Sequence, residues 1–384
     1  MDYANVAVAS PISFGYARYS AQPADWFVAQ CLRQLLTASG LRKEEVDGLS
    51  VSSFTLPPNP VAGLSRSLGL CLTWLESIPF GGASGVMALR RAARAVQAGD
   101  ASVVACIGAD TNRPGVFEEL ICQFSTVTMD AVYRHGGAGP TMPFAHLTQQ
   151  YMQVSGARRE DFGALCVSQR FNAAHCDHAL LHKPLSLQDY LEAPEIASPL
   201  HKFDLVMPCA GADGFLVLRE DHAKRLQIPY ARVKATVERH NAFAGDELLS
   251  RGGWELDRSR LYAAAGCTPA QIDVVATYDD CPAVVFMQLE GLGICPPGCA
   301  AEFVISNDLT FKGNYPHNTG GGQLGCGQAG AAGGFVGMVE TLRQLTGQAH
   351  GRQVEGPRLG LVGGYGMAIY DRCLATGAAI LEAA

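Results

Sequence analysis

The sequence predicts an α/β fold made of two similar halves. Short apolar runs of strand length alternate with longer segments of helical periodicity, and glycine-rich turns separate them. A strand, a turn, a helix and another strand in that order imply parallel strands with helical crossovers. The same order returns, more weakly, in the later part of the chain, which indicates a duplication. We therefore expect one half at 1–225 and the other at 226–384.

The expected elements of the first half share an apolar core and a polar or glycine boundary. In order they are Ala4–Ala9 (strand), Ala24–Ala38 (helix), Val46–Val51 (strand), Leu72–Ile78 (strand), Ala83–Gln97 (helix), Val103–Gly108 (strand) and Gly214–Arg219 (strand). The segment 111–205 interrupts this rhythm with polar turns and helical stretches at Thr148–Val154 and Arg159–His175. We interpret it as an insertion that caps the site and shapes substrate specificity.

The second half repeats the plan with longer helices. Its expected elements are Val233–Glu238 (strand), Asp257–Ala265 (helix), Val274–Tyr278 (strand), Pro282–Leu292 (helix), Gly333–Leu345 (helix), Leu359–Val362 (strand) and Met367–Tyr370 (strand). The last two strands are expected to flank a glycine loop at 363–366.

Composition excludes several classes of function. The 384 residues are 48% hydrophobic, enough for two domains with cores, and the net charge of −7 argues against nucleic acid or an anionic membrane as partner. No run reaches the ~20 apolar residues of a membrane span, and no secretory signal is expected. Thirteen cysteines without such a signal indicate reduced thiols and a cytoplasmic location.

We expect no metal site. His175 and His178 with Cys176 between them, and Cys295 with Cys299, have loosely metal-like spacing, but neither group has a second pair of ligands.

The first segment with chemical potential is the turn Gly81–Gly85, which opens an apolar helix. A sharp turn before a helix aims backbone N–H groups and the positive helix end at a ligand. Gly82 has no side chain to act as a nucleophile, but its N–H can serve an oxyanion hole. Close packing of a strand on a helix explains these small residues equally well.

The second segment places Tyr278 and Asp279 at the end of an expected strand, before a helix. A tyrosine there can reach a pocket and exchange a proton once its neighbours lower its pKa. The alternative is a core tyrosine whose hydroxyl is hydrogen-bonded, with Asp280 as the helix N-cap.

The third segment has the highest glycine density of the chain. His317-Asn318-Thr319-Gly320-Gly321-Gly322 is followed by Gly327-Gln328-Ala329-Gly330. Gln328 can donate an amide N–H to a carbonyl or enolate oxygen, but it cannot exchange protons near neutral pH. The fourth segment, Gly363-Gly364-Tyr365-Gly366, holds a large aromatic ring among glycines, which favours a place near substrate over simple packing.

Together these segments resemble the active-site loops of the thiolase superfamily. In that family a nucleophilic cysteine stands before Ala-Ser-Gly, where this chain has Gly82. The patterns Asn-Pro-Ser-Gly-Gly and Gly-His-Pro-x-Gly-Ala are matched by Asn318 and the glycines around it, with Gln328 in place of histidine. A second catalytic cysteine belongs to a C-terminal Cys-x-Gly-Gly loop, and no cysteine stands there in this chain.

The chain is most similar to the sterol-carrier-protein or lipid-transfer type of thiolase-like protein. Within that type it resembles the cysteine-less aldolases of steroid side-chain degradation, which carry one tyrosine in a Tyr-Asp pair and another in the C-terminal glycine loop. Tyr278 and Tyr365 fit these two slots. The resemblance implies duplicated βαβαβαββ halves in a layered αβαβα arrangement.

The function that the resemblance implies is retro-aldol cleavage of a 3-hydroxyacyl-CoA thioester into a ketone or aldehyde and a shorter acyl-CoA. The substrate, steroid side-chain-like or otherwise bulky, carries coenzyme A, and no bound cofactor is expected. One of Tyr278 and Tyr365 is the base and the other the acid or relay. The thioester oxygen would lie against Gly82 N–H, Gln328 and the backbone from Gly364 to Gly366.

Three further residues complete the expected site. His317 and Asp279 are expected to tune the tyrosines, and Asn318 to help form the substrate-binding loop. The resemblance also implies a homodimer, with the strand at 72–78 near the two-fold axis, and a small OB-fold partner bearing a zinc ribbon.

Two alternatives stay open at this stage. The first is a thiolase or acyltransferase in which Cys281 or Cys326 serves as a relocated nucleophile. The second is a non-catalytic subunit that binds acyl-CoA or lipid.

Overall fold

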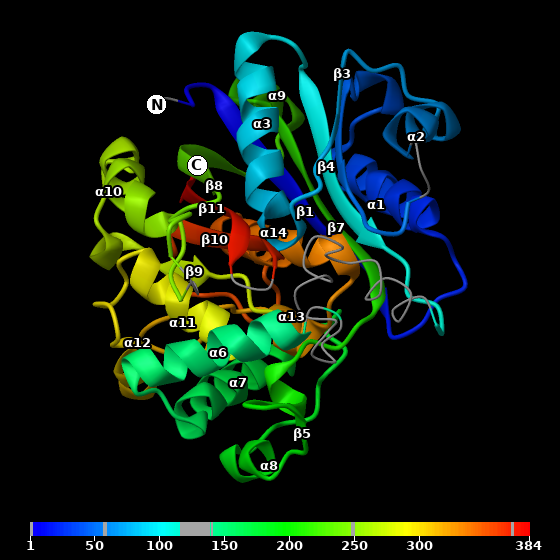
Figure 1. Cartoon of the computed structure of the whole chain (residues 1–384). Coiled ribbons are helices and arrows are strands. Elements are labelled where there is room, and N and C mark those ends of the chain that lie inside the picture. Colours follow the sequence, from blue (N-terminus) through cyan, green and yellow to red (C-terminus); the bar gives the residue numbers. More distant parts are fainter. Residues whose placement is uncertain (1–2, 57–59, 116–138, 140, 247–249, 370–371) are drawn as a thin grey trace.

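The structure is a computed structural model, shown in Figure 1. It describes residues 3–56, 60–115, 139, 141–246, 250–369 and 372–384. The strands are β1 (Val6–Ala17), β2 (Gly48–Ser52), β3 (Trp74–Ser77), β4 (Val103–Asp110), β5 (Glu195–Ala197), β6 (Leu200–His201), β7 (Ala210–Arg219), β8 (Tyr230–His240), β9 (Val274–Ala276), β10 (Leu359–Ala368) and β11 (Cys373–Ala383). The α-helices are α1 (Ala24–Ser39), α2 (Pro60–Leu68), α3 (Ser84–Ala98), α6 (Thr141–Ser155), α7 (Arg159–Ala173), α8 (Leu187–Leu191), α9 (Glu220–Leu226), α10 (Trp254–Ala265), α11 (Pro282–Gly291), α12 (Ala300–Ser306), α13 (Gly322–Cys326) and α14 (Gly333–Leu345). Short 3-10 turns include η2 (Gly81–Ala83) and η6 (Gly330–Ala332).

The described strands form a nine-stranded sheet in the order β3-β2-β4-β7-β1-β8-β11-β10-β9, with β5 and β6 as a separate pair. The expected parallel pairing holds for β2 with β3, β2 with β4, and β10 with β9. The other neighbours are antiparallel. A short antiparallel contact of β1 with β8, from Ala7 opposite Arg232 to Ala9 opposite Tyr230, joins the strands of the two halves.

The side chains of each strand divide between two cores, which gives the layered αβαβα arrangement. In β7, Phe215 and Val217 pack with the central helices α3 and α14, whereas Leu216 and Leu218 pack in the cluster around α1. In β11, Ala379 faces the same central helices, and neighbouring residues join the cluster around α10 and α11. The layers are therefore α1, the sheet of the first half, α3 with α14, the sheet of the second half, and α10 with α11 (Figure 1).

The central helices are buried on nearly every side because sheet strands cover them from both directions. In α3 the buried residues run through successive positions at the helix start, from Ser84 to Leu89, rather than along one stripe. The helix ends where Gly99 adopts a left-handed φ of 83° and its N–H closes the last turn. The N-termini of α3 and α14, each preceded by a glycine-containing 3-10 turn, meet near the site described below.

One expected loop is a strand. The segment 363–366 is the middle of β10, paired residue by residue with β11 (Tyr365 opposite Thr376), so the expectation of two short strands around a glycine loop is wrong. The physical reason is the turn η2, which packs directly on this strand. A Cβ on Gly366 would overlap the carbonyl oxygen of Phe80, and one on Gly364 would press on the backbone of Ala83.

The inserted segment contains α7 at the expected place, whereas α6 begins at Thr141, seven residues before the expected start, and the part at 116–138 lies outside the described residues. The division of the chain at residue 225 stays a prediction. None of the helices in the described ranges has the length and apolar character needed to cross a bilayer.

Candidate active site

A cavity opens where η2, the end of β4, the end of β10 and the turn after β9 come together. Its polar or backbone-lined wall includes Gly82, Asp110, Cys209, Tyr278, Asp280, Gln328, Tyr365 and Gly366. Its apolar wall includes Phe54, Phe144, Met367 and Ala368. A concave, mostly apolar pocket with a few convergent polar groups is typical of a small-molecule site.

Gly82 faces the ring of Tyr278 with no room for a side chain between them. A Cβ at position 82 would overlap the Cε2 and Cζ atoms of Tyr278 and the carbonyl oxygen of Tyr365. The turn also needs Gly81 with a φ of 48°, which few residues with a side chain adopt. The space that a nucleophile at position 82 would occupy is therefore filled by a tyrosine ring.

Tyr278 is fixed by its backbone, which leaves its ring to face the cavity. The amide side chain of Gln288 on α11 accepts from Tyr278 N–H (3.1 Å) and donates to its carbonyl (2.6 Å). This pair of bonds replaces the sheet ladder that ends with β9 at Ala276. Burial, together with the neighbouring Asp280 carboxyl, raises the pKa of Tyr278 well above its ordinary value.

Asp280 lies beside Tyr278 and is partly exposed to the cavity. The N-cap position of α11 belongs to Cys281, so the alternative of Asp280 as a helix cap is wrong. Gln328 Nε2 donates to Asp280 Oδ1 and also lies 3.1 Å from Tyr278 Oη. Burial raises the pKa of Asp280 to about 7, and the adjacent Asp279 adds to this effect.

Gln328 is held by backbone bonds to the segment that precedes β7. Its N–H donates to Met207 O (2.8 Å) and its carbonyl accepts from Cys209 N–H (2.9 Å). Gly327 reaches this position with a φ of 98°. The amide side chain therefore points at Tyr278 and Asp280 from a rigid backbone.

Asp110 also lines the cavity, but its oxygens are already in use. It accepts hydrogen bonds from Ser53 Oγ, the Phe54 and Thr55 N–H groups, Thr55 Oγ1 and Ala331 N–H. These donors tie β4 to the loop after β2 and to η6. We interpret Asp110 as a structural clamp of the cavity wall.

Tyr365 reaches the cavity from β10 and is 2% exposed. Its ring stacks on Trp254 at 6.0 Å between centroids and lies 6.5 Å from Phe144. Burial raises the pKa of Tyr365 well above its ordinary value, so its hydroxyl is protonated near neutral pH. Of the expected site residues, Tyr278, Tyr365, Gln328, Gly82 and Gly366 thus share one cavity.

The other expected residues lie outside the cavity lining. Asp279 accepts from Gln323 N–H (3.0 Å), Leu324 N–H (3.1 Å) and Gln169 Nε2 (2.6 Å), so it anchors the start of α13. Asn318 bridges the N–H and carbonyl of Thr277.

The two remaining residues, His317 and Gly364, are also absent from the cavity lining. His317 contacts Thr277 Oγ1 (2.9 Å), and burial lowers its pKa to about 3, so it stays neutral. Gly364 packs on η2.

The two cysteines considered as relocated nucleophiles are buried away from the cavity lining. Cys281 is 0% exposed, and burial raises its pKa to about 12. Cys326 is also 0% exposed and its thiol donates to Gly320 O at 3.1 Å. Cys209 does line the cavity, but burial raises its pKa as well. A thiol in its protonated form is a poor nucleophile.

Known proteins match this fold and these motifs. Residues 238–377 match the family model of the thiolase C-terminal domain-like proteins. The chain is 30% identical over 335 residues to 17-hydroxy-3-oxo-4-pregnene-20-carboxyl-CoA lyase of Mycobacterium tuberculosis, covering 83% of this chain and 86% of that protein. It is 30% identical over 303 residues to a steroid side-chain-cleaving aldolase of Thermomonospora curvata, covering 75% and 77%. The solved structure titled Ltp2-ChsH2(DUF35) aldolase superimposes with a TM-score of 0.87 at 26% identity, covering 99% of this chain and 98% of that one.

The layered fold, with Gly82 at the point where thiolases carry their nucleophilic cysteine, defines a protein of the thiolase fold. This chain belongs to the thiolase superfamily, in the sterol-carrier-protein-like branch that includes the steroid side-chain-cleaving aldolases and lyases. Like those relatives it is a carbon–carbon lyase.

Proposed function

We propose that the chain cleaves a 3-hydroxyacyl-CoA thioester by retro-aldol chemistry, releasing a ketone or aldehyde and a shorter acyl-CoA. The observation that carries the proposal is the Tyr278 ring above Gly82, because it replaces a nucleophile by a proton-transfer group at the same point. Retro-aldol cleavage needs a base, donors for an enolate and an acid, but no covalent intermediate.

Proton transfer begins at the β-hydroxyl of the substrate. Tyr278 Oη takes this proton while its own proton passes to Asp280, so that the tyrosine acts as relay and the carboxylate as the final base. Tyrosines with raised pKa values cannot serve as the final base near neutral pH, whereas a carboxyl with a pKa of about 7 can. Gln328, which contacts both groups, would hold them in the orientation that proton transfer needs.

The bond between the α- and β-carbons then breaks, and its electron pair moves into the thioester carbonyl to give an enolate. The Tyr365 hydroxyl and the Gly82 N–H are the donors that we assign to the enolate oxygen. Protonation of the α-carbon, with the proton held on Asp280 and returned through Tyr278, completes the shorter acyl-CoA. Asp279 and His317 support this face indirectly, through the loop contacts that they make.

The cavity wall favours a bulky acyl group. Phe54, Phe144, Met367 and Ala368 offer apolar surface, which suits the side chain and rings of a steroid. The Mycobacterium tuberculosis relative is named for a steroid carboxyl-CoA substrate. We propose a substrate of the same class, with a tertiary β-hydroxyl.

A partner protein follows from the same comparison. The solved aldolase structure names a second protein of the DUF35 type, and we propose that this chain works with a small OB-fold, zinc-ribbon partner of that kind. The homodimer with β3 near the two-fold axis and the cytoplasmic location stay predictions.

The test is cleavage of a synthetic 3-hydroxyacyl-CoA with a tertiary β-hydroxyl, followed by mass spectrometry, with and without the partner. Wild type is expected to release a ketone and the shorter acyl-CoA, and Tyr365→Phe to lose this activity. Splitting of a 3-ketoacyl-CoA that depends on free CoA would instead support the thiolase alternative. Tight binding of CoA esters without turnover, even with the partner present, would support the non-catalytic subunit.

A further inference from the structure

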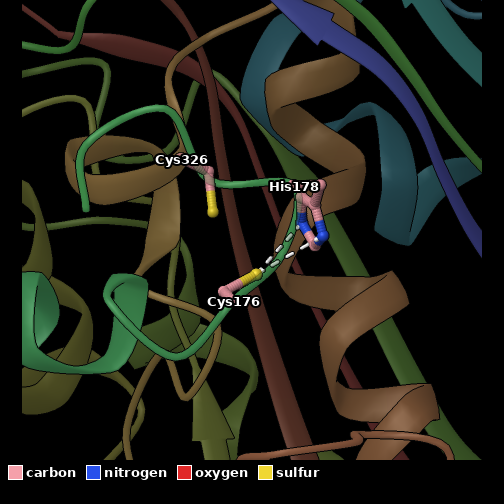
Figure 2. Close-up of side chains that lie close together, drawn as sticks. All are labelled: Cys176, His178 and Cys326. Atoms are coloured by element: carbon pink, nitrogen blue, oxygen red, sulfur yellow. Dashed lines mark hydrogen bonds between the residues drawn. The ribbon is translucent and has the colours of Figure 1, made fainter.

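A second group of reactive side chains lies behind the cavity, outside its lining. Cys176 and His178 follow the end of α7, and Cys326 ends α13. One ligand atom from each of the three residues lies within 4.8 Å of the other two. In Figure 2 the sulfur of Cys176 points at the His178 ring, and the sulfur of Cys326 points toward the same space. Residues far apart in the sequence thus bring two thiols and an imidazole together.

On one side this group packs against apolar side chains. On the other side it faces polar groups that already hydrogen-bond to one another. Cys176 and Cys326 are 1% and 0% exposed and pack with Ala173 and Ala179. The Asp213 carboxylate, also buried, accepts from Ser13 and Tyr16 and is used by them. His178 is partly exposed, and its ring lies 5.5 Å from that of Tyr16. The imidazole therefore lies between solvent and the two buried sulfurs.

The separations match those of a thiolate and imidazole metal centre. With zinc–sulfur bonds of about 2.3 Å and zinc–nitrogen bonds of about 2.0–2.1 Å, tetrahedral ligands lie about 3.6 Å apart for a sulfur and a nitrogen and about 3.8 Å apart for two sulfurs. Cys176 Sγ lies 3.4 Å from Nδ1 and 3.5 Å from Nε2 of His178, which places it over the ring face. The ring must turn for one nitrogen to direct its lone pair at an ion shared with this sulfur. A shift of at most about 1 Å brings Cys326 Sγ, within 4.8 Å of both, to the same spacing.

We propose that Cys176, His178 and Cys326 bind one zinc ion, with the fourth position open on the His178 side. Two thiolates neutralise the dication, which suits a buried site, and sulfur with imidazole nitrogen is the ligand set that zinc takes in proteins.

The consequence for the site is a fixed loop. Cys326 stands two positions before Gln328, whose amide contacts Tyr278 and Asp280. The backbones already meet where Leu180 N–H donates to Cys326 O at 3.2 Å. Zinc would lock this junction between the segment after α7 and the loop that carries Gln328. This inference does not depend on the proposed substrate.

The test is the metal content of the full chain purified under reducing conditions. We expect one zinc per chain by mass spectrometry of the metal. Cobalt bound in its place is expected to show the sulfur-to-cobalt absorption and the intense visible bands of a four-coordinate site. Cys326→Ser should remove both signals. His178→Asn removes a direct ligand, so it should weaken zinc binding by more than about 10–100-fold, the cost of losing an outer-shell partner. Because His178 is partly exposed, its variant tests the site even if the buried serine variant does not fold.

The matched control is Cys71→Ser, which removes an exposed thiol and should retain the full zinc content. Three results would overturn the proposal: wild type without stoichiometric zinc after zinc is added, equal zinc affinity in wild type and His178→Asn, or loss of zinc in Cys71→Ser.

Discussion

Asp279 and Asp280 are neighbours in the chain, but only Asp280 faces the cavity. Asp279 accepts hydrogen bonds from two backbone N–H groups and from Gln169. These bonds take up the hydrogen-bonding capacity of Asp279 and hold α13 in place. Asp280 meets Gln328 and Tyr278 and keeps part of its surface in the cavity. Asp110, elsewhere in the cavity lining, also has its oxygens occupied by hydrogen bonds. The difference teaches that unused hydrogen-bonding capacity and exposure to the cavity, rather than residue type, separate the carboxylate that we propose as base from the structural ones.

Replacing Asp280 by Asn should produce the largest effect. An amide cannot accept a proton from Tyr278, so kcat is expected to fall about 10²–10⁴-fold. The Asn oxygen can still accept from Gln328 Nε2, so the free energy of unfolding should be no lower than that of wild type. Steady-state kinetics and urea unfolding measure the two quantities. Full activity in this variant would remove Asp280 from the proton path.

Filling the space between Gly82 and Tyr278 should produce the second-largest loss of activity. Gly82→Ala places a methyl group against the Tyr278 ring and the carbonyl of Tyr365, so the ring must move. We expect a loss of about 10²-fold in activity from misplacement and about 1–3 kcal/mol in stability from overpacking. The control is Gly63→Ala in α2, where nothing lies within 4 Å of the added carbon. If Gly82→Ala behaves like this control, the ring does not occupy the nucleophile position.

Replacing Asp279 by Asn should reverse the pattern seen at Asp280. One oxygen is lost and an NH₂ group faces the N–H donors of α13, so we expect about 1–3 kcal/mol of destabilisation. Activity of the folded fraction should change much less than in Asp280→Asn. Urea unfolding with Asp100→Asn, an exposed position, as control gives the comparison. A large loss of kcat at unchanged stability would place Asp279 in the catalytic step.

The sequence alone could predict most of the fold and half of the site. Strands and helices with clear apolar periodicity were predicted near their observed bounds, because burial of one or both faces determines them. The continuity of β10 was not predicted, since its glycines serve the close approach of η2, a contact between distant segments. Tyr278, Gln328 and Gly82 could be placed together because each stands in a segment that resembles a thiolase active-site loop.

Asp280 was missed for a different reason. After β9 ends, no periodicity tells which of two consecutive carboxylates turns toward the cavity, and the contacts of Asp279 with α13 decide it. The group of Cys176, His178 and Cys326 was missed because its third member lies far along the chain. The signal in the sequence is the run Tyr278-Asp279-Asp280 at a strand end. It offers two carboxylates, and α13 needs only one of them.

The pH dependence should give the smallest and most diagnostic effect. Because the base must be deprotonated, kcat/KM is expected to rise with pH, to reach half its maximum at about pH 7, and to be flat above it. The rise should vanish in Asp280→Asn and persist in Asp279→Asn, which separates the two neighbours although burial also raises the pKa of Asp279, to about 6. The other titratable groups of the cavity, Tyr278, Tyr365, Asp110 and Cys209, remain in both variants.

The contribution of Asp280 to the free energy of unfolding should change with pH in the opposite direction to the activity. The folded pKa of Asp280 exceeds the unfolded value of about 3.9, so folding favours the protonated carboxyl. Its contribution to stability is full at low pH and is lost as pH rises to about 7. Asp280→Asn, which resembles the protonated form, should therefore match wild type at about pH 3.5, below the unfolded pKa, and become the more stable protein at pH 8. Equal stability differences at both pH values would mean that Asp280 titrates normally, and the carboxylate would then be no better suited to accept the proton than any exposed one.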